Sequence, residues 1–182
     1  VGKMMAAYCM DHKDETVEFI ENPEDLAKEI FMPMETWGKF NGYTTDPNIN
    51  PHYIRPAMLQ QRLQKIMDEY VGGVGTWYMT SKYMLEEGFY YLGLLKEDSY
   101  HMCAENLHEL LRAWENFHRI LAGEAHARHI HFREETRYPG YYYRGDHLAI
   151  DDENWKCFVN STYDKESGEW DIFKREYHQL VP

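Results

Sequence analysis

Three amphipathic stretches follow one another between residues 56 and 135, and they constrain the fold more than any other feature of the chain. In each of them apolar side chains recur every three to four residues, which is the period of an α-helix with one buried face. The stretches run from Pro56 to about residue 71, from residue 80 or 81 to about residue 98, and from Asn106 to about residue 135. Helices with short connections bury such faces best as an antiparallel bundle. We therefore predict a mainly α fold built on an antiparallel three-helix bundle.

The apolar residues of each stretch define the face that we expect to be buried. In the first stretch these residues are Leu59, Leu63, Ile66, Met67 and Tyr70. In the second they are Leu85, Phe89, Leu92 and Leu95. In the third they are Leu107, Leu110, Leu111, Trp114, Phe117, His118 and Leu121. Polar pairs four residues apart, Glu115 with Arg119 and Glu124 with Arg128, are expected on the solvent side of the third helix.

The chain before the bundle contains two further helix signals. Residues 1–10 have the composition of a buried helix but no residue that caps its start, and both ends of the chain look like cuts in a longer polypeptide. Asn22 and Pro23 predict the start of a second helix, which Pro33 should kink or end. The composition of residues 38–55 is that of a loop.

The pattern changes after residue 137. Residues 141–144 are expected to be extended and to dock on the bundle, and residues 155–161 and 169–177 are expected to form a small β-hairpin around a turn at 164–168. A lone hairpin is only marginally stable, so it must pack against something. We divide the chain into 1–21, the end of a preceding domain, 22–137, the helical domain, and 138–182, an extended tail with a hairpin.

Charge and cysteine content narrow the class of protein. With 19 Lys and Arg against 31 Asp and Glu, the formal net charge is −12, which disfavours binding to nucleic acid. No apolar run approaches the about 18 to 20 residues of a membrane-spanning helix. The three cysteines, Cys9, Cys103 and Cys157, form no C-x-x-C pair, and we interpret them as reduced thiols of a cytoplasmic protein.

Several residue patterns suggest catalytic or metal chemistry, but their spacing favours structural roles. His126 and His129 share a helix face while His131 points elsewhere, so a single helix does not present all three to one ion. The acidic run 151–153 is typical of a solvated surface or a helix cap. Residues 72–75, Gly-Gly-Val-Gly, lack the Lys-Ser/Thr of a phosphate loop and follow a helix rather than a strand, so we interpret them as a helix end.

The densest group of arginine, acidic and aromatic residues lies between 133 and 144. Arginine guanidinium groups and aromatic rings make planar contacts with carboxylates, phosphates or other rings. Two interpretations stand side by side: a docking surface for another domain or subunit, or an internal ion-pair network that closes the bundle. The candidate docking residues are Arg133, Glu135, Arg137, Tyr141, Tyr142, Tyr143, Arg144 and Trp155.

This group resembles the end of a known flavoprotein family. Arg133-x-Glu135-Thr136-Arg137, followed by Asp151-Asp152-Glu153-Asn154-Trp155-Lys156, is similar to the flavoprotein subunits of fumarate reductase and succinate dehydrogenase, in which Arg-x-Glu-Ser-Arg-Gly precedes Asp-Asp-x-x-Trp. The chain departs at Thr136, where Ser is usual, and at residues 138–140, where Tyr-Pro-Gly replaces Gly-Ala-His.

Two longer strings resemble a narrower branch of this family, the alpha subunits of dissimilatory adenylylsulfate reductases. They are residues 135–144 and 153–160, and the resemblance extends over the whole chain, with Gly2 to Tyr8 similar to the last helix of the FAD-binding domain. The resemblance implies a parent enzyme that uses FAD to interconvert adenylylsulfate with AMP and sulfite, through a sulfite adduct at flavin N5. It also implies a partner beta subunit that carries two iron–sulfur clusters.

The resemblance assigns no catalytic or cofactor-binding residue to this chain. In the family the glycine-rich FAD fingerprint and the active-site arginine and histidine lie upstream of the matching region. The chain is therefore expected to be the C-terminal helical domain of such a subunit, to be inert by itself, and to pack against the FAD domain through residues 1–10. Two alternatives remain: a free-standing helical module that binds metal or haem through its histidines, and a free-standing protein-interaction bundle.

Overall fold

The computed structural model describes residues 2–14, 22–25, 27–28, 54–104, 106–138 and 140–178. The chain forms two compact units, Val1–Met32 and Pro33–Pro182. No helix within the described ranges is long and apolar enough to cross a membrane. The domain boundaries at 21/22 and 137/138 remain predictions.

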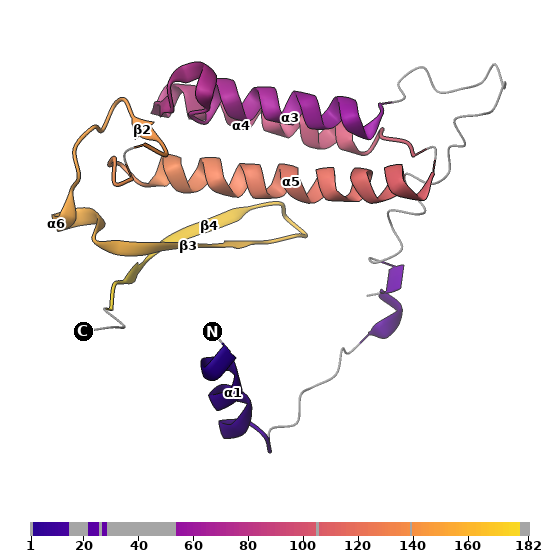
Figure 1. Ribbon diagram of the computed structural model, residues 1–182, viewed down its shortest axis with the longest axis horizontal. Coiled ribbons are helices and arrows are strands. Elements are labelled where there is room, and N and C mark those ends of the chain that lie inside the picture. Colours follow the sequence, from indigo (N-terminus) through magenta and orange to yellow (C-terminus); the bar gives the residue numbers. More distant parts are fainter. Residues whose placement is uncertain are drawn as a thin grey trace. The chain divides into compact units, whose positions relative to one another are not determined.

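The first unit contains the helix α1 (Gly2–Asp11), which has no buried residue (Figure 1). Its side chains Met4, Met5, Tyr8 and Met10 are exposed. A second helical segment starts after Asn22, as predicted, and includes residues 23–25 and 27–28. The predicted break at Pro33 and the predicted loop as far as residue 53 lie outside the described residues.

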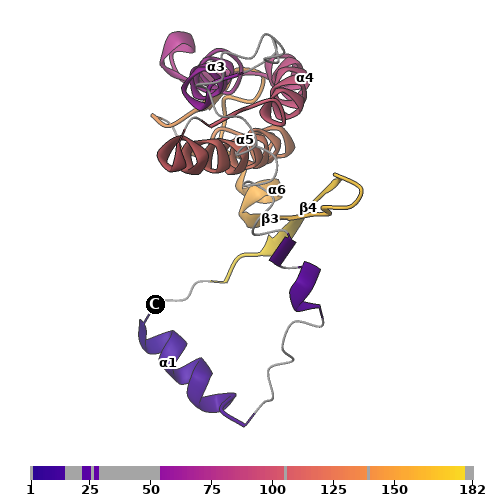
Figure 2. The same cartoon turned by 90° about the vertical axis from the view of Figure 1, so that its right-hand side faces the viewer.

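The second unit is built on three helices, α3 (Pro56–Tyr70), α4 (Lys82–Ser99) and α5 (Leu107–Phe132) (Figures 1 and 2). Contacts between their ends show that consecutive helices are antiparallel. Arg62 on α3 pairs with Asp98 at the end of α4, with 2.7 Å between nitrogen and oxygen. His131 at the end of α5 lies 3.6 Å from the carboxylate of Glu86 near the start of α4. The predicted three-helix bundle is confirmed.

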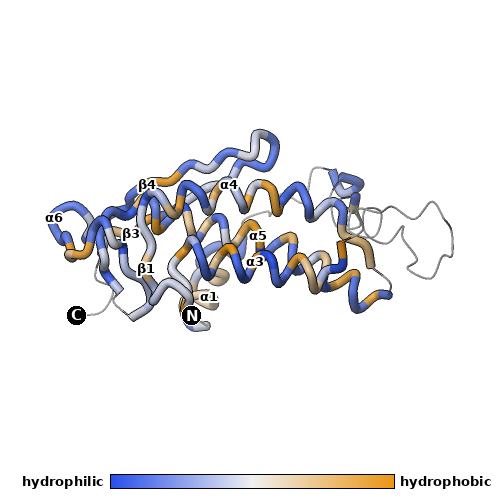
Figure 3. The backbone as a smooth tube through the Cα atoms, turned by 90° about the horizontal axis from the view of Figure 1, so that it is seen from above, coloured by the Kyte–Doolittle hydropathy of each residue, from blue (hydrophilic) through white to orange (hydrophobic). Residues whose placement is uncertain are grey.

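The helix starts follow from their capping residues. The Ser81 hydroxyl accepts a hydrogen bond from the Met84 N–H at the start of α4, and the Asn106 side chain accepts one from the Glu109 N–H at the start of α5. Pro56 occupies the first turn of α3, where its missing N–H costs nothing. Along the three helices, hydrophilic and hydrophobic residues alternate as an amphipathic bundle requires (Figure 3).

On α3 and α4 the predicted faces contain the buried leucines and otherwise half-buried residues. On α5 no predicted residue is buried, although Leu110, Phe117 and Leu121 are half-buried. Leu59 and Leu63 on α3, and Leu85, Leu92 and Leu95 on α4, are buried. On α5, however, Leu107 is 78% exposed, Leu111 49% and Trp114 40%. The residues that α5 buries are Ala113, Asn116, Ile120, Gly123, Ala127 and Ile130.

Close helix packing explains this difference. A Cβ added at Gly123 would lie 3.1 Å from the Met67 sulfur of α3, so α5 approaches α3 closely at this position. The buried Asn116 side chain donates a 2.7 Å hydrogen bond to the Pro56 carbonyl oxygen at the start of α3, which satisfies both groups.

Two small strand pairs complete the second unit. After the short 3-10 helix η1 (Val74–Thr76), β1 (Met79–Thr80) pairs in parallel with β2 (Tyr143–Arg144), which confirms that this segment is extended and docked on the bundle. The predicted hairpin is also confirmed, as antiparallel β3 (Cys157–Tyr163) and β4 (Trp170–Glu176). The first strand begins at Cys157 rather than at residue 155, because residues 152–155 form the helix α6 (Asp152–Trp155).

The hairpin rests on the bundle through polar contacts. The His129 ring of α5 shares a 2.9 Å hydrogen bond with the Ser161 hydroxyl, and the Lys96 ammonium of α4 donates a 2.9 Å bond to the Tyr163 hydroxyl. These contacts supply the support that an isolated hairpin lacks.

Candidate functional site

The residues between 133 and 144 surround a buried carboxylate, that of Glu135, which has no exposed surface. Its Oε1 accepts hydrogen bonds from Arg133 Nη1 and, at 2.6 Å, from Arg137 Nε. Its Oε2 accepts from Arg137 Nη2 and from the Asp151 N–H, both at 2.9 Å. Burial alone would raise the pKa of Glu135, but the hydrogen bonds from Arg137, Asp151 and Arg133 outweigh it and lower the pKa.

The two arginines that hold Glu135 also tie the following segments together. Arg133 donates to the carbonyl oxygens of Trp155 at 2.8 Å and Cys157 at 2.7 Å. Arg137 donates to the Asp152 carboxylate at 2.9 Å. The hydrogen bonds with Glu135 raise the pKa of Arg137, so this guanidinium stays charged. The network therefore connects the end of α5 to α6 and to the start of β3.

Arg144 joins the ends of two helices. Its side chain is 1% exposed, and its Nη1 donates to the carbonyl oxygens of Ile130, His131 and Arg133 at 2.5–3.0 Å. These carbonyls belong to the C-terminal end of α5, where backbone oxygens lack helical partners and a positive charge is favourable.

Asp146 completes this connection at the neighbouring helix. Arg144 Nε and Nη2 each donate to its carboxylate at 2.9 Å, and the Lys82 N–H in the first turn of α4 donates to it at 3.0 Å. The hydrogen bonds from Arg144 hold the pKa of Asp146 well below its ordinary value. The pair thus places a cation at the end of α5 and an anion at the start of α4, where the two helix dipoles favour them.

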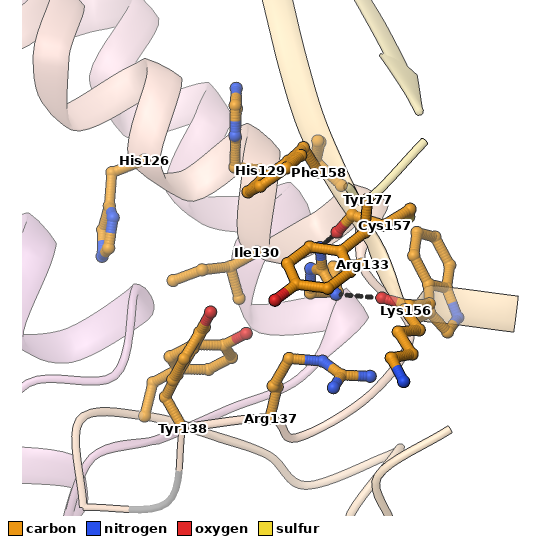
Figure 4. A pocket seen from close by; sticks show the side chains of 13 residues that line it. His126, His129, Ile130, Arg133, Arg137, Tyr138, Lys156, Cys157, Phe158 and Tyr177 are labelled. Carbon is orange, nitrogen blue, oxygen red and sulfur yellow. Dashed lines mark hydrogen bonds between the residues drawn. The ribbon is translucent and has the colours of Figure 1, made fainter. Parts of the chain in front are cut away.

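A pocket of about 720 Å³ opens beside this network (Figure 4). Arg133, Arg137 and Lys156 line it, and no acidic residue does. The remaining lining residues are His126, His129, Ile130, Tyr138, Tyr142, Trp155, Cys157, Phe158, Val159 and Tyr177. Basic and aromatic groups around an open cavity favour a carboxylate or an aromatic side chain as its occupant.

Two histidines and one tyrosine of the pocket have pKa values shifted toward their neutral forms. Desolvation lowers the pKa of His126, and the neighbouring His129 lowers it further. Desolvation and the Arg133 charge lower the pKa of His129. Burial raises the pKa of Tyr142. No hydrogen bond among the described residues joins the Cys157 thiol to either histidine.

The eight candidate docking residues divide by exposure. Glu135, Arg144 and Trp155 are buried, and the charged groups of Glu135 and Arg144 bond within the chain, which fits the internal-network interpretation. Tyr141 is 82% exposed, while Arg133, Arg137, Tyr142 and Tyr143 are partly exposed. A docking role for the exposed members stays a prediction.

Trp155 fixes α6 against the bundle. It is 7% exposed, its ring meets the Phe132 ring edge-on at 5.6 Å, and the Lys174 ammonium of β4 lies 3.6 Å from its centroid. The acidic run before it acts as a helix cap, because the Asp151 carboxylate accepts a 3.1 Å hydrogen bond from the Asn154 N–H. A helix cap was one of the two roles that the sequence predicted for this acidic run.

The last three of the five histidines of α5 diverge. His126 and His129 line the pocket, whereas the His131 ring packs edge-on against Phe89 at 5.4 Å. The part of the chain that the structure describes contains no group of three His, Cys, Asp or Glu arranged to hold a metal ion.

Asp146 and Trp77 are the residues that the sequence analysis missed. Asp146 follows Arg144 by two positions, which is a local signal for an ion pair. No sequence signal separates Trp77, 85% exposed after η1, from a core tryptophan.

Comparison with known proteins shows which proteins this chain is similar to in sequence and structure. The chain is 50% identical over all 182 residues to the adenylylsulfate reductase subunit alpha of Megalodesulfovibrio gigas. The chain is homologous to adenylylsulfate reductase alpha subunits. The solved adenylylsulfate reductase of Archaeoglobus fulgidus shares 43% identity over 99% of the chain, with a TM-score of 0.80. No protein-family model matches the sequence.

The homologous region is only part of these proteins. The chain spans 27% of the M. gigas subunit and 28% of the A. fulgidus chain. A quinol fumarate reductase of E. coli shares the fold, at 16% identity over 90% of the chain and 27% of its own, with a TM-score of 0.66. The expected relationship to this flavoprotein fold is confirmed. A free-standing interaction or metal-binding module is not favoured, because the adenylylsulfate reductase match covers the whole chain.

Proposed function

We propose that these 182 residues form the C-terminal helical domain of an FAD-dependent adenylylsulfate reductase alpha subunit. The complete enzyme would interconvert adenylylsulfate with AMP and sulfite in a two-electron step. Its electrons would pass through a partner beta subunit with iron–sulfur clusters. The observation that carries this proposal is the 50% identity to such a subunit along the entire chain. We propose a cytoplasmic location, in line with three free cysteines.

The described residues do not fit an FAD site. Residues 72–75 are the only glycine-rich run of the bundle, and they follow helix α3 instead of a strand. The N–H groups of Gly73 and Gly75 donate to Asp68, at 3.1 and 3.0 Å, and so are not free to bind a pyrophosphate. We therefore assign FAD to the portion of the alpha subunit outside this chain.

The role that we propose for this domain is architectural. Its buried charges are committed to internal partners: Glu135 to two arginines, and Arg144 to Asp146 and three helix carbonyls. Such a network fixes the relative positions of helix ends, α6 and the hairpin, and so presents a rigid surface to the rest of the enzyme. The exposed members of the docking set, Tyr141 above all, would contact the remaining alpha chain or the partner subunit.

The test uses Glu135→Gln in the complete alpha subunit, assembled with its partner. Gln keeps the shape of the side chain but removes the carboxylate that pairs with Arg133 and leaves Arg137 with Asp152 as its acidic partner, so we expect lower stability and less assembled enzyme. The turnover per bound flavin should stay unchanged. A lower turnover per flavin at normal flavin content would place this domain in the chemistry and would refute the architectural role. Glu134→Gln, at an exposed neighbouring carboxylate, is the matched control.

A further inference from the structure

The hairpin lies on the bundle without a buried core of its own, since no residue of β3 or β4 is fully buried. Two side-chain hydrogen bonds, each 2.9 Å long, join it to the helices. One runs between the His129 ring and the Ser161 hydroxyl, and the other from the Lys96 ammonium to the Tyr163 hydroxyl. Segments with little buried apolar surface open locally at a low cost in free energy. The docking of the hairpin therefore depends on a small number of polar contacts.

His129 lies among groups that carry or can take up a positive charge. His126 precedes it by three positions and Arg133 follows it by four, so the three side chains lie along one side of α5 and line the pocket (Figure 4). A proton on His129 would therefore add a charge to a lining that already contains several cations. The other titratable residues of this lining are Arg137, Tyr138, Tyr142, Lys156, Cys157 and Tyr177.

The acidic residues of the neighbouring segments provide no counter-charge within the pocket. The Glu135 carboxylate accepts its hydrogen bonds from Arg133 and Arg137. Asp171 lies on the strand face opposite to that of Ser161, because alternate residues of a strand point to opposite sides. All the acidic residues of these segments belong to the described part of the chain, and none lines the pocket: Glu124, Glu134, Glu135, Asp151, Asp152, Glu153, Asp171 and Glu176.

We propose that the hairpin is a pH-sensitive strap across the pocket: it is docked on α5 while His129 is neutral, and protonation of His129 weakens this attachment. A protonated ring would lie one helical turn from Arg133, and like charges at this spacing repel each other. The half-buried ring also lacks the hydration that a charged group needs. Movement of β3 away from α5 would admit water to the ring and so reduce both costs.

The direction of the pH response follows from the docked state. Burial and the Arg133 charge lower the pKa of His129 while the hairpin is docked. The ring therefore takes up a proton more readily once the hairpin has moved away. The attachment is complete above the ordinary histidine pKa of about 6.5 and weakens as the pH falls below it.

The other contacts of the hairpin keep its two ends in place during this change. The Lys96 ammonium holds Tyr163 at the turn end of β3, and Arg133 donates a 2.7 Å hydrogen bond to the Cys157 carbonyl oxygen at the base. Lysine and arginine side chains ordinarily keep their charge between pH 5 and 8. The strand between these two points, which forms one wall of the pocket, is therefore the part that loosens.

The experiment measures backbone hydrogen exchange of the complete alpha subunit by mass spectrometry at pH 7.5, 6.5 and 5.5. It compares the wild type with His129→Gln at each pH, so that the intrinsic pH dependence of exchange cancels. Gln can form a hydrogen bond with Ser161 but does not take up a proton. We expect the ratio of wild-type to variant exchange rates in residues 157–163 and 170–176 to rise at least about twofold between pH 7.5 and pH 5.5. In α4 the ratio should stay constant.

Two further variants make the test independent of how well His129→Gln folds. Ser161→Asp places a carboxylate opposite His129, so the protonated ring gains a partner and hairpin exchange relative to the wild type should fall with the pH. His118→Gln is the matched control, because His118 is an exposed histidine of α5 that does not line the pocket. It should keep the wild-type pH dependence.

Two results would overturn the proposal. If His129 has only a structural role, His129→Gln changes hairpin exchange by the same factor at every pH. If the strap does not respond to the charge of His129, Ser161→Asp and the wild type show the same pH dependence. Neither result alters the outcome expected for Glu135→Gln, because the strap contacts do not include the Glu135 carboxylate.

Discussion

Replacing Arg144 by methionine should destabilise the helical unit more than any exposed charge substitution. Methionine fills most of the space of the arginine stem but offers no donor, so the three carbonyl oxygens at the end of α5 and the Asp146 carboxylate lose their partner together. The Asp146 side chain is 29% exposed and keeps the Lys82 N–H, so the loss comes mainly from the carbonyl oxygens, each of which costs about 1–3 kcal/mol when it is buried without a partner. We expect about 3–5 kcal/mol in all. A domain of this size has a total stability of about 5–15 kcal/mol.

The assay is urea denaturation followed by circular dichroism, together with thermal unfolding. The expected loss of about 3–5 kcal/mol corresponds to a fall in melting temperature of about 6–20 °C for a domain of 150–250 residues. Arg119→Met is the matched control, because Arg119 is 47% exposed and pairs with Glu115 at the surface. It should cost less than about 1 kcal/mol.

A double-mutant cycle with Asp146→Asn tests the mechanism. If Arg144 and Asp146 act as one unit, the double variant should be more stable than the sum of the two single losses predicts, by about 1–3 kcal/mol. The reasoning is refuted if Arg144→Met costs no more than Arg119→Met, or if the two single losses simply add.

Two further predictions concern the stability of the domain at low pH and the buried side chain of Trp155. Glu135 and Asp146 have folded-state pKa values below their unfolded values. The stability that they contribute is therefore complete above about pH 4–5 and is lost as the pH falls through the lowered pKa values. An unfolding free energy that stays constant from pH 5 to pH 2 would contradict this prediction. Trp155→Ala should lower the free energy of unfolding by about 3–5 kcal/mol because it leaves a cavity. It should also remove the near-ultraviolet circular dichroism of the packed indole. Trp114→Ala, at a 40% exposed site on α5, should lower the free energy of unfolding far less.

The sequence predicted the elements of the bundle because their signals are local. Apolar spacing and the capping residues Ser81 and Asn106 determine where α4 and α5 begin, and both depend only on neighbouring residues. The buried face of α5 could not be predicted in the same way. There, Gly123 is buried because α3 approaches closely, and the distance between two helices is not encoded in the periodicity of either.

In the candidate site, too, the local signals were visible in the sequence but the burial of the residues was not. The group of arginines and acids between residues 133 and 144 was visible in the sequence, but the choice between a docking surface and an internal network depended on burial. Arg144 is enclosed by the carbonyl oxygens at the end of α5 and by Asp146, and Asp146 in turn accepts a hydrogen bond from Lys82 at the start of α4, which is far away along the chain. Trp77 gave no signal at all, since only the folded loop leaves it in solvent.

The position of Arg144 and Asp146 in the chain has a consequence for biosynthesis. Both residues follow the helices whose ends they join, and Asp146 is translated 47 residues after Ser99, the last residue of α4. At about 5–20 residues per second, the ribosome needs roughly 2–9 s to add them. During this interval α4 and α5 emerge without the clamp between their ends, so nascent chains stalled before residue 144 should be cleaved by protease more readily than those released after residue 146.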